Sequence, residues 1–214
     1  MKTMSTAMKC TLPILFSLIL VAVSSGQSQQ SPAKTPTIAG VLDSSRTAVF
    51  EAPQQSCDSS DIPDAMARAF RDDKGMIHLV AASSELFQNI GPTLESVQHS
   101  CEVGYHSAID GNPADFNDSV WIDSFYTFDG QHIAGLGHTE YHGWVHAGEC
   151  KAPPANYVEC EYDADTYHRS NDGGYHFNSP KAPADFLVGI PYKYAVDRGP
   201  MGYSVDTNII ELVL

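Results

Sequence analysis

Three residues at alternate positions, His138, Glu140 and His142, are the part of this sequence best suited to chemistry. They end a run of small and apolar residues, 133–137, which is typical of a β-strand covered on both faces. If the strand continues through them, its pleat places all three side chains on one face. A carboxylate between two imidazoles can accept or deliver protons, so we take this group as the leading candidate site.

A metal ion is an alternative use of the same residues. Two imidazoles and one carboxylate form an acceptable set of ligands for Zn²⁺. The spacing also invites comparison with helical zinc motifs, but Gly135, Gly137 and Gly143 argue against a helix. A polar cavity lining is the more ordinary explanation, and we expect no metal and no cofactor.

A β-hairpin is expected to position the three residues. Asp129-Gly130 separates two apolar and aromatic runs that extend from Trp121 to Trp144, and Asp-Gly in that setting favours a type I′ turn. Gly135 and Gly137 would let a neighbouring strand or sheet approach closely.

The rest of the chain has the same character and predicts an all-β protein. An earlier hairpin is expected over residues 65–82, around Asp73-Lys74-Gly75, followed by two more polar strands at 85–90 and 97–105. The unit that begins at Trp121 repeats this order, with outer strands expected at 157–162 and 166–177. Helical periodicity is absent apart from a turn around 64–68.

The first residues have the form of a secretory signal peptide. Lys2 and Lys9 precede an apolar run, 12–23, which is followed by small residues and a cleavage site near Gly26. We therefore expect a leader at 1–26 and a secreted, extracellular protein. Residues 27–48, rich in Ser, Gln, Pro and Thr, are expected to form a disordered linker.

Four cysteines remain after the leader, which suggests two disulfides in one of three pairings. Cys150 and Cys160 flank a Pro-rich loop that a local bridge would pin. Cys57 with Cys101 would then tie the segment before the first hairpin to its outer strands. Asn117-Asp118-Ser119 is a candidate N-glycosylation site, which would place that loop at the surface.

The net charge of −14 excludes some partners. Such a surface repels phosphate backbones and anionic membranes, and no basic cluster overrides it. We expect no nucleic-acid partner and, because no segment after the leader is long enough to span a bilayer, no membrane partner once the leader is cleaved.

The segment SNDGGYHF, residues 170–177, is the sharpest local motif. It resembles the Asp box of sialidase-type β-propellers, matched at Ser170, Asp172, Gly174 and Phe177. The Asp172 carboxylate can accept backbone N–H groups of its own turn, and the glycines supply positive φ. In those propellers the box lies between the outer two strands of a blade and is structural, so we expect no catalytic role for it.

More broadly, residues from about 61 to 208 resemble secreted five-bladed propeller proteins related to arabinanase- and xylosidase-type glycoside hydrolases. The shared features occur in the order DIPDAMARAF, RDDKGMIHLVA, WIDSFYTFDG, HTEYHG, SNDGGYHF and GPMGYSVDTNII. The resemblance implies a β-propeller-like array of four-stranded antiparallel blades that binds carbohydrate near acidic residues on the inner strands. It assigns those acidic positions to Asp64, with Asp61 as a rival, to Asp123 and to Glu140, and it places Asp206 at the start of a third blade.

Glycoside cleavage needs one protonated carboxyl group and a second, ionised one. We predict Glu140 as the acid, because burial would raise its pKa, and Asp64 as the base, kept ionised by Arg68. Trp121, Tyr141 and Trp144 would stack on sugar rings. The predicted substrate-binding set is Asp61, Arg68, Trp121, His138, Tyr141 and His142. The alternative is a non-catalytic carbohydrate- or protein-binding propeller, in which the acidic residues cap turns and the tryptophans are core.

The predicted array is incomplete. Within a domain at 49–214, blade 1 is expected at about 61–108, blade 2 at about 119–180, and the start of blade 3 at about 184–214. Propellers contain about four to eight blades. We therefore expect that missing C-terminal blades or a partner chain are needed to close the propeller, and that the sequence is a truncated or N-terminal part.

Overall fold

The computed structural model describes residues 46–151 and 160–196, all of which belong to one compact unit, residues 45–214. Within these ranges the regular elements are eight strands and two short 3₁₀ turns, so the all-β prediction is confirmed. The predicted leader, most of the predicted linker and Asp206 lie outside the described residues. No helix in the described ranges has the length and apolar character of a membrane span.

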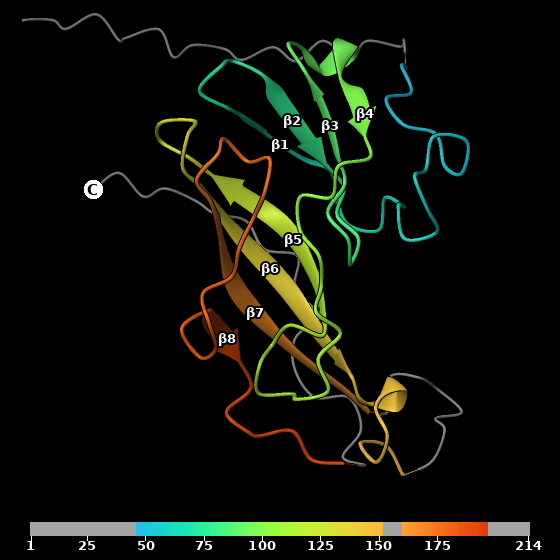
Figure 1. Ribbon diagram of the computed structural model, residues 1–214, viewed down its shortest axis with the longest axis vertical. Coiled ribbons are helices and arrows are strands. Elements are labelled where there is room, and N and C mark those ends of the chain that lie inside the picture. The colour runs from blue at the N-terminus through green and yellow to red at the C-terminus, as the bar shows by residue number, and fades with distance from the viewer. Residues whose placement is uncertain (1–45, 152–159, 197–214) are drawn as a thin grey trace, which may run out of the picture. The chain divides into compact units, whose positions relative to one another are not determined.

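Two four-stranded antiparallel sheets, each with its strands in chain order, form the described structure (Figure 1). The first sheet contains β1 (Arg68–Arg71), β2 (Ile77–Val80), β3 (Gln88–Gly91) and β4 (Gln98–Ser100), with the 3₁₀ turn η1 (Leu94–Ser96) before β4. β1, β2 and β4 lie within segments predicted from the sequence, and β3 ends one residue beyond the predicted segment 85–90. The β1–β2 turn forms where predicted because Gly75 takes a φ of 81° and the Asp72 carboxylate accepts the N–H groups of Lys74 and Met76.

The second sheet contains β5 (Ser119–Tyr126), β6 (Ile133–His142), β7 (Glu161–Ser170) and β8 (Phe186–Gly189), and the 3₁₀ turn η2 (Gly143–Val145) follows β6. The β5–β6 hairpin is confirmed, but its predicted type I′ turn is wrong. The connection spans residues 127–132, and only Gly130 has positive φ there. The Asp129 carboxylate organises the loop instead, because it accepts the N–H groups of Gln131 and His132.

The outer half of the second sheet also differs from the prediction. One continuous strand, β7, replaces the two expected at 157–162 and 166–177, because it pairs with β6 along its full length. The fourth strand, β8, pairs with β7 and completes this sheet. We had predicted that segment as the start of a third unit.

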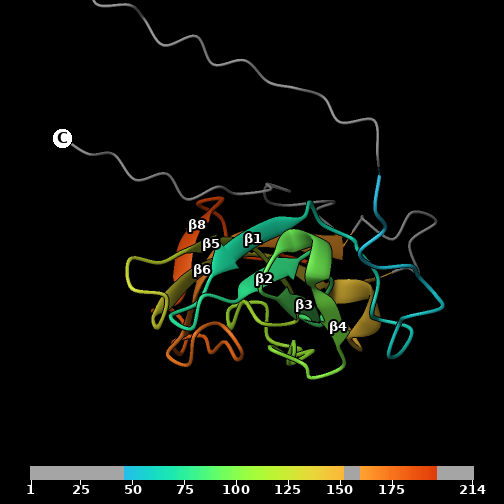
Figure 2. The same cartoon turned by 90° about the horizontal axis from the view of Figure 1, so that it is seen from above.

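The two sheets pack against each other through a shared apolar core. β1 lies beside β5 (Figure 2), and the two hairpin turns touch, because the Asp73 N–H donates to the Gly130 carbonyl at 3.0 Å. The buried core residues come from both sheets and from the Asp-box loop: Phe70, Val80, Ala82, Leu86, Val120, Ile122, Ile133 and Phe177.

A glycine in β6, Gly137, makes room for a buried row of hydrogen-bonded polar side chains. A Cβ atom at Gly137 would lie 2.6 Å from His168 Nε2, which confirms the predicted close approach. Hydroxyl and imidazole groups link Thr139 to Thr166 at 3.0 Å, Thr166 to His168 at 2.8 Å, and His168 to Ser179 at 2.9 Å. Burial lowers the pKa of His168 to about 3, so this histidine is neutral and serves the fold.

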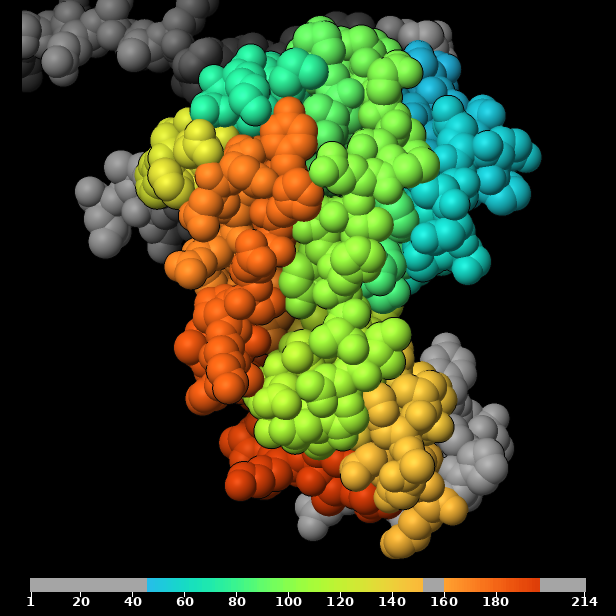
Figure 3. All heavy atoms as spheres, viewed as in Figure 1, coloured from blue at the N-terminus to red at the C-terminus, as the bar shows by residue number. Residues whose placement is uncertain are grey.

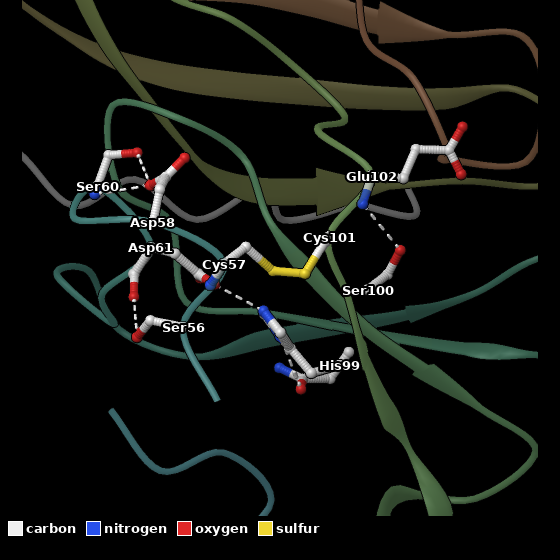
Figure 4. The surroundings of a disulfide bond; sticks show 10 residues. Ser56, Cys57, Asp58, Ser60, Asp61, His99, Ser100, Cys101 and Glu102 are labelled. Carbon is white, nitrogen blue, oxygen red and sulfur yellow. Dashed lines mark hydrogen bonds and ion pairs between the residues drawn. A yellow bond between two sulfur atoms is a disulfide. The ribbon is translucent and has the colours of Figure 1, made fainter. Parts of the chain in front are cut away.

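The cysteines pair as Cys57–Cys101 and Cys150–Cys160, which selects one of the three pairings left open by the sequence. The first bridge joins the segment before β1 to the residue that follows β4 (Figure 4). A sequence separation of 44 residues makes it the longer-range of the two constraints.

The Asp-box segment lies between β7 and β8, the outer two strands of its sheet. The Asp172 carboxylate accepts the Ser170 hydroxyl at 2.7 Å and the His176 N–H at 3.1 Å, and Gly174 has a φ of 94°. Phe177 is buried in the core between the sheets. These contacts are the structural ones that the motif predicts.

Candidate functional site

The outer face of the second sheet, the side turned away from the first sheet, carries the residues with the strongest potential for chemistry. His138, Glu140 and His142 alternate along β6 with the buried Thr139 and Tyr141. The predicted pleat is therefore confirmed, and the three side chains share one face.

Glu140 is held between the two imidazoles. His138 Nε2 lies 3.0 Å from its Oε1 atom, and His142 Nε2 lies 2.8 Å from its Oε2 atom. Burial by itself would raise the pKa of Glu140, but the hydrogen bonds and positive charges of both imidazoles outweigh it and lower that pKa to about 2. In turn, although burial opposes the charged form, the bond to Glu140 raises the pKa of His138.

The prediction that Glu140 is a protonated acid is therefore wrong. The carboxylate stays ionised at neutral pH, so its chemical role is that of a base, a nucleophile or a stabiliser of positive charge.

A second row of carboxylates faces this group from β7. The register pairs Glu140 with Asp163, His142 with Glu161 and His138 with Asp165. Burial, with repulsion from Glu161 and Glu140, raises the pKa of Asp163 to about 8, although His138 acts in the opposite direction. Burial also raises the pKa of Glu161, which is hydrogen-bonded to Asp163, so this pair of carboxyl groups holds a proton at neutral pH beside the ionised Glu140.

Sequence reasoning missed this second row. The signal was available in the segment Glu161-Tyr-Asp163-Ala-Asp165, which alternates polar and apolar residues in the same way as His138 to His142. It was overlooked because the predicted strand boundary fell inside the segment, at residue 162, and split the alternation.

Aromatic side chains flank the charged group. The Trp121 ring lies 6.0 Å from His138 and 6.4 Å from His142, and the Trp144 ring stacks on His142 at 4.3 Å. The Trp121 indole N–H donates to Asp64 Oδ2 at 3.0 Å, which brings Asp64 to the edge of the same group. Asp64, Trp121, His138, Glu140 and His142 are therefore gathered in one place.

Two predicted members do not belong to this group. Tyr141 points to the opposite face of β6, where it is 2% exposed, donates to the Gly111 carbonyl and stacks on His146, so it cannot stack on a sugar at Glu140. Arg68 does not pair with Asp64 in the described part of the chain; its guanidinium donates to the Ala67 carbonyl.

Asp61 and Asp123 are buried, at 4% and 3% exposure. Asp61 Oδ2 accepts the Cys57 N–H at 2.8 Å and lies 2.7 Å from His99 Nε2 (Figure 4). Asp61 and His99 line a mainly apolar cavity of about 190 Å³ on the first sheet. Asp123 lies at a β-bulge in β5. Of the predicted acidic positions, Asp64 and Glu140 therefore lie in the same group of residues.

A Zn²⁺ site at His138 and His142 is not favoured, because the two Nε2 atoms are directed to different oxygens of Glu140. Within the described ranges, ligand atoms of three His, Cys, Asp or Glu side chains converge only at Cys57, Asp61 and His99. The Cys57 sulfur there is bonded to Cys101, so it is not available as a thiolate ligand.

The predicted glycosylation residue, Asn117, is half-buried and lies two residues before the start of β5. Its backbone carbonyl accepts the Ala108 N–H at 2.9 Å. Glycosylation there stays a prediction.

The fold and site together define an all-β protein with two disulfides, two meander sheets and a histidine- and carboxylate-rich sheet face flanked by tryptophans. In comparisons with protein-family models, with curated proteins and with solved structures, nothing matches this chain.

Proposed function

We propose that this protein is a secreted, propeller-type protein that acts on carbohydrate in the manner of a glycoside hydrolase. The observation that carries the proposal is the pairing of ionised Glu140 with protonated Asp163 on neighbouring strands. Two carboxyl groups whose environments separate their pKa values in this way are the pair that glycoside cleavage requires.

Their roles in the reaction follow from their charge states. Asp163 would deliver its proton to the leaving glycosidic oxygen, and Glu140 would stabilise or attack the positively charged sugar carbon. His138 and His142 hold both Glu140 oxygens and keep the carboxylate ionised. In this assignment Asp163, rather than Glu140, is the acid. Asp64 accepts the hydrogen bond from the Trp121 indole and orients that ring.

The arrangement of the sheets supports the propeller part of the proposal. A propeller consists of about four to eight four-stranded blades around a central channel. β1 lies beside β5, the equivalent hairpin turns touch, and an Asp box connects the third and fourth strands of the second sheet. The two described sheets do not close into a ring.

Secretion is supported by the two disulfides, because such bonds persist in oxidising compartments.

Removing the Trp121 ring is expected to weaken carbohydrate binding about tenfold, because the ring is the half-buried aromatic surface next to Glu140. The measurement is a calorimetric titration of wild type and Trp121→Ala with arabino- and xylo-oligosaccharides. Phe128→Ala is the matched control, since that ring is 83% exposed in the β5–β6 turn and should bind as wild type. Equal affinities for wild type and Trp121→Ala, or no binding of either sugar series, would contradict a sugar site on this face.

A further inference from the structure

A separate polar cavity of about 560 Å³ lies where two loops meet, the β4–β5 connection and the β7–β8 connection. These segments lie side by side on the face of the molecule shown in Figure 3. Oxygen-bearing side chains from both loops line it, namely Asp110, Asp115, Asn117, Ser179 and Asp185. The carboxylates outnumber the one lysine in its wall, Lys181.

Two buried oxygen atoms in this cavity lack a donor. Asp185 is 2% exposed, and its Oδ1 atom has no hydrogen-bond partner; Asn117 Oδ1 is likewise buried and unpartnered. Buried acceptors are normally satisfied, so two unpartnered oxygen atoms among the residues that line one cavity indicate a missing group.

The chemistry of the lining selects the missing group. Carboxylate and amide oxygens are the ligands of hard cations, and Ca²⁺ takes six to eight such oxygens in flexible geometry, including waters. Mg²⁺ demands a near-ideal octahedron, which two loops around a wide cavity do not offer. Zn²⁺ prefers nitrogen and sulfur, whereas the one imidazole in the lining, His106, is already paired with Glu85.

We propose that this cavity is a Ca²⁺ site whose protein ligands are Asp115, Asn117 and Asp185. The remaining positions would be filled by water, for which the cavity has room. A bound ion would join the loop before β5 to the loop before β8. It would therefore connect the first and the last strand of the second sheet. This site is distinct from the Glu140 group and does not depend on the proposed function.

The test is calorimetric titration of the full chain with CaCl₂ after chelator treatment, with Asn117 unglycosylated, together with thermal melting. We expect one saturable Ca²⁺ site with a dissociation constant of about 10⁻⁴–10⁻³ M, the range of extracellular modules, a higher melting temperature with Ca²⁺, and at least tenfold weaker Mg²⁺ binding. Asp185→Asn should weaken Ca²⁺ binding at least tenfold, whereas Asp73→Asn, in the exposed β1–β2 turn, should bind as wild type.

If Asp185→Asn does not fold, Asp115→Asn, in a half-exposed loop, gives the same comparison. Absence of saturable heat up to about 10 mM CaCl₂, well above the affinity range of such sites, would overturn the proposal. So would unchanged Ca²⁺ affinity in a folded Asp185→Asn or Asp115→Asn protein.

Discussion

Asp163→Asn is expected to reduce glycoside turnover at neutral pH by about 10²–10⁴-fold, the usual contribution of a general acid. The amide cannot supply the proton that Asp163 retains through burial and repulsion from its neighbours. Glu140→Gln should reduce turnover by a similar factor, because it removes the ionised partner, while sugar binding is retained. The measurement is release of nitrophenol from a panel of aryl arabinosides and xylosides.

Asp165→Asn is the matched control for this prediction. Asp165 lies on the same face of β7 and its pKa is also raised by burial, but it pairs with His138 rather than with Glu140. It should keep turnover within a few-fold of wild type. Wild-type turnover in Asp163→Asn would contradict the acid assignment. If Glu140→Gln changes neither turnover nor binding, the non-catalytic binding module becomes the better interpretation.

Loss of the Cys57–Cys101 bridge in the double variant Cys57→Ser, Cys101→Ser is expected to lower the free energy of unfolding by about 2–5 kcal/mol. The bridge closes a loop with a separation of 44 residues, against 10 for Cys150–Cys160. Loop-closure entropy grows with the logarithm of loop length, so removing the longer bridge should cost about 1 kcal/mol more than removing the shorter one.

Urea denaturation of wild type and both serine double variants measures this difference. The Cys150–Cys160 variant is the control, because it loses the same chemical bond in a shorter loop. Equal losses, or a larger loss from the shorter loop, would show that the first bridge does not restrain the unfolded chain in this way.

The β5–β6 hairpin was predictable because its turn residues and the apolar runs on either side of them both indicate two paired strands. Asp129-Gly130 marks the turn, and the polar residues at the alternate positions 138, 140 and 142 fix which side chains share a face. The same alternation places Tyr141 opposite Glu140. Assigning Tyr141 to the site was therefore an error that the pleat itself could have prevented.

The charge state of Glu140 could not be predicted from its neighbours in sequence. The prediction considered only the burial of Glu140, whereas in the structure the imidazoles of His138 and His142 each donate to one of its carboxylate oxygens. Asp163 was missed because its importance depends on strand register, which pairs it with Glu140 across 23 positions of sequence. Local patterns specify strands and faces, but the relative charge of two carboxyl groups depends on which strands become neighbours.

The most direct test of the proposed site is a carbon-detected NMR titration of the carboxyl groups, assigned with Asp163→Asn and Glu140→Gln. We predict an Asp163 midpoint near pH 8 and a Glu140 carboxylate that stays ionised down to about pH 2. The pair is then in its working state, one carboxyl protonated and one ionised, across the pH range between these values. Midpoints for both residues in the ordinary range of about 4 would leave no protonated carboxyl at neutral pH and would contradict the proposed acid–base pair.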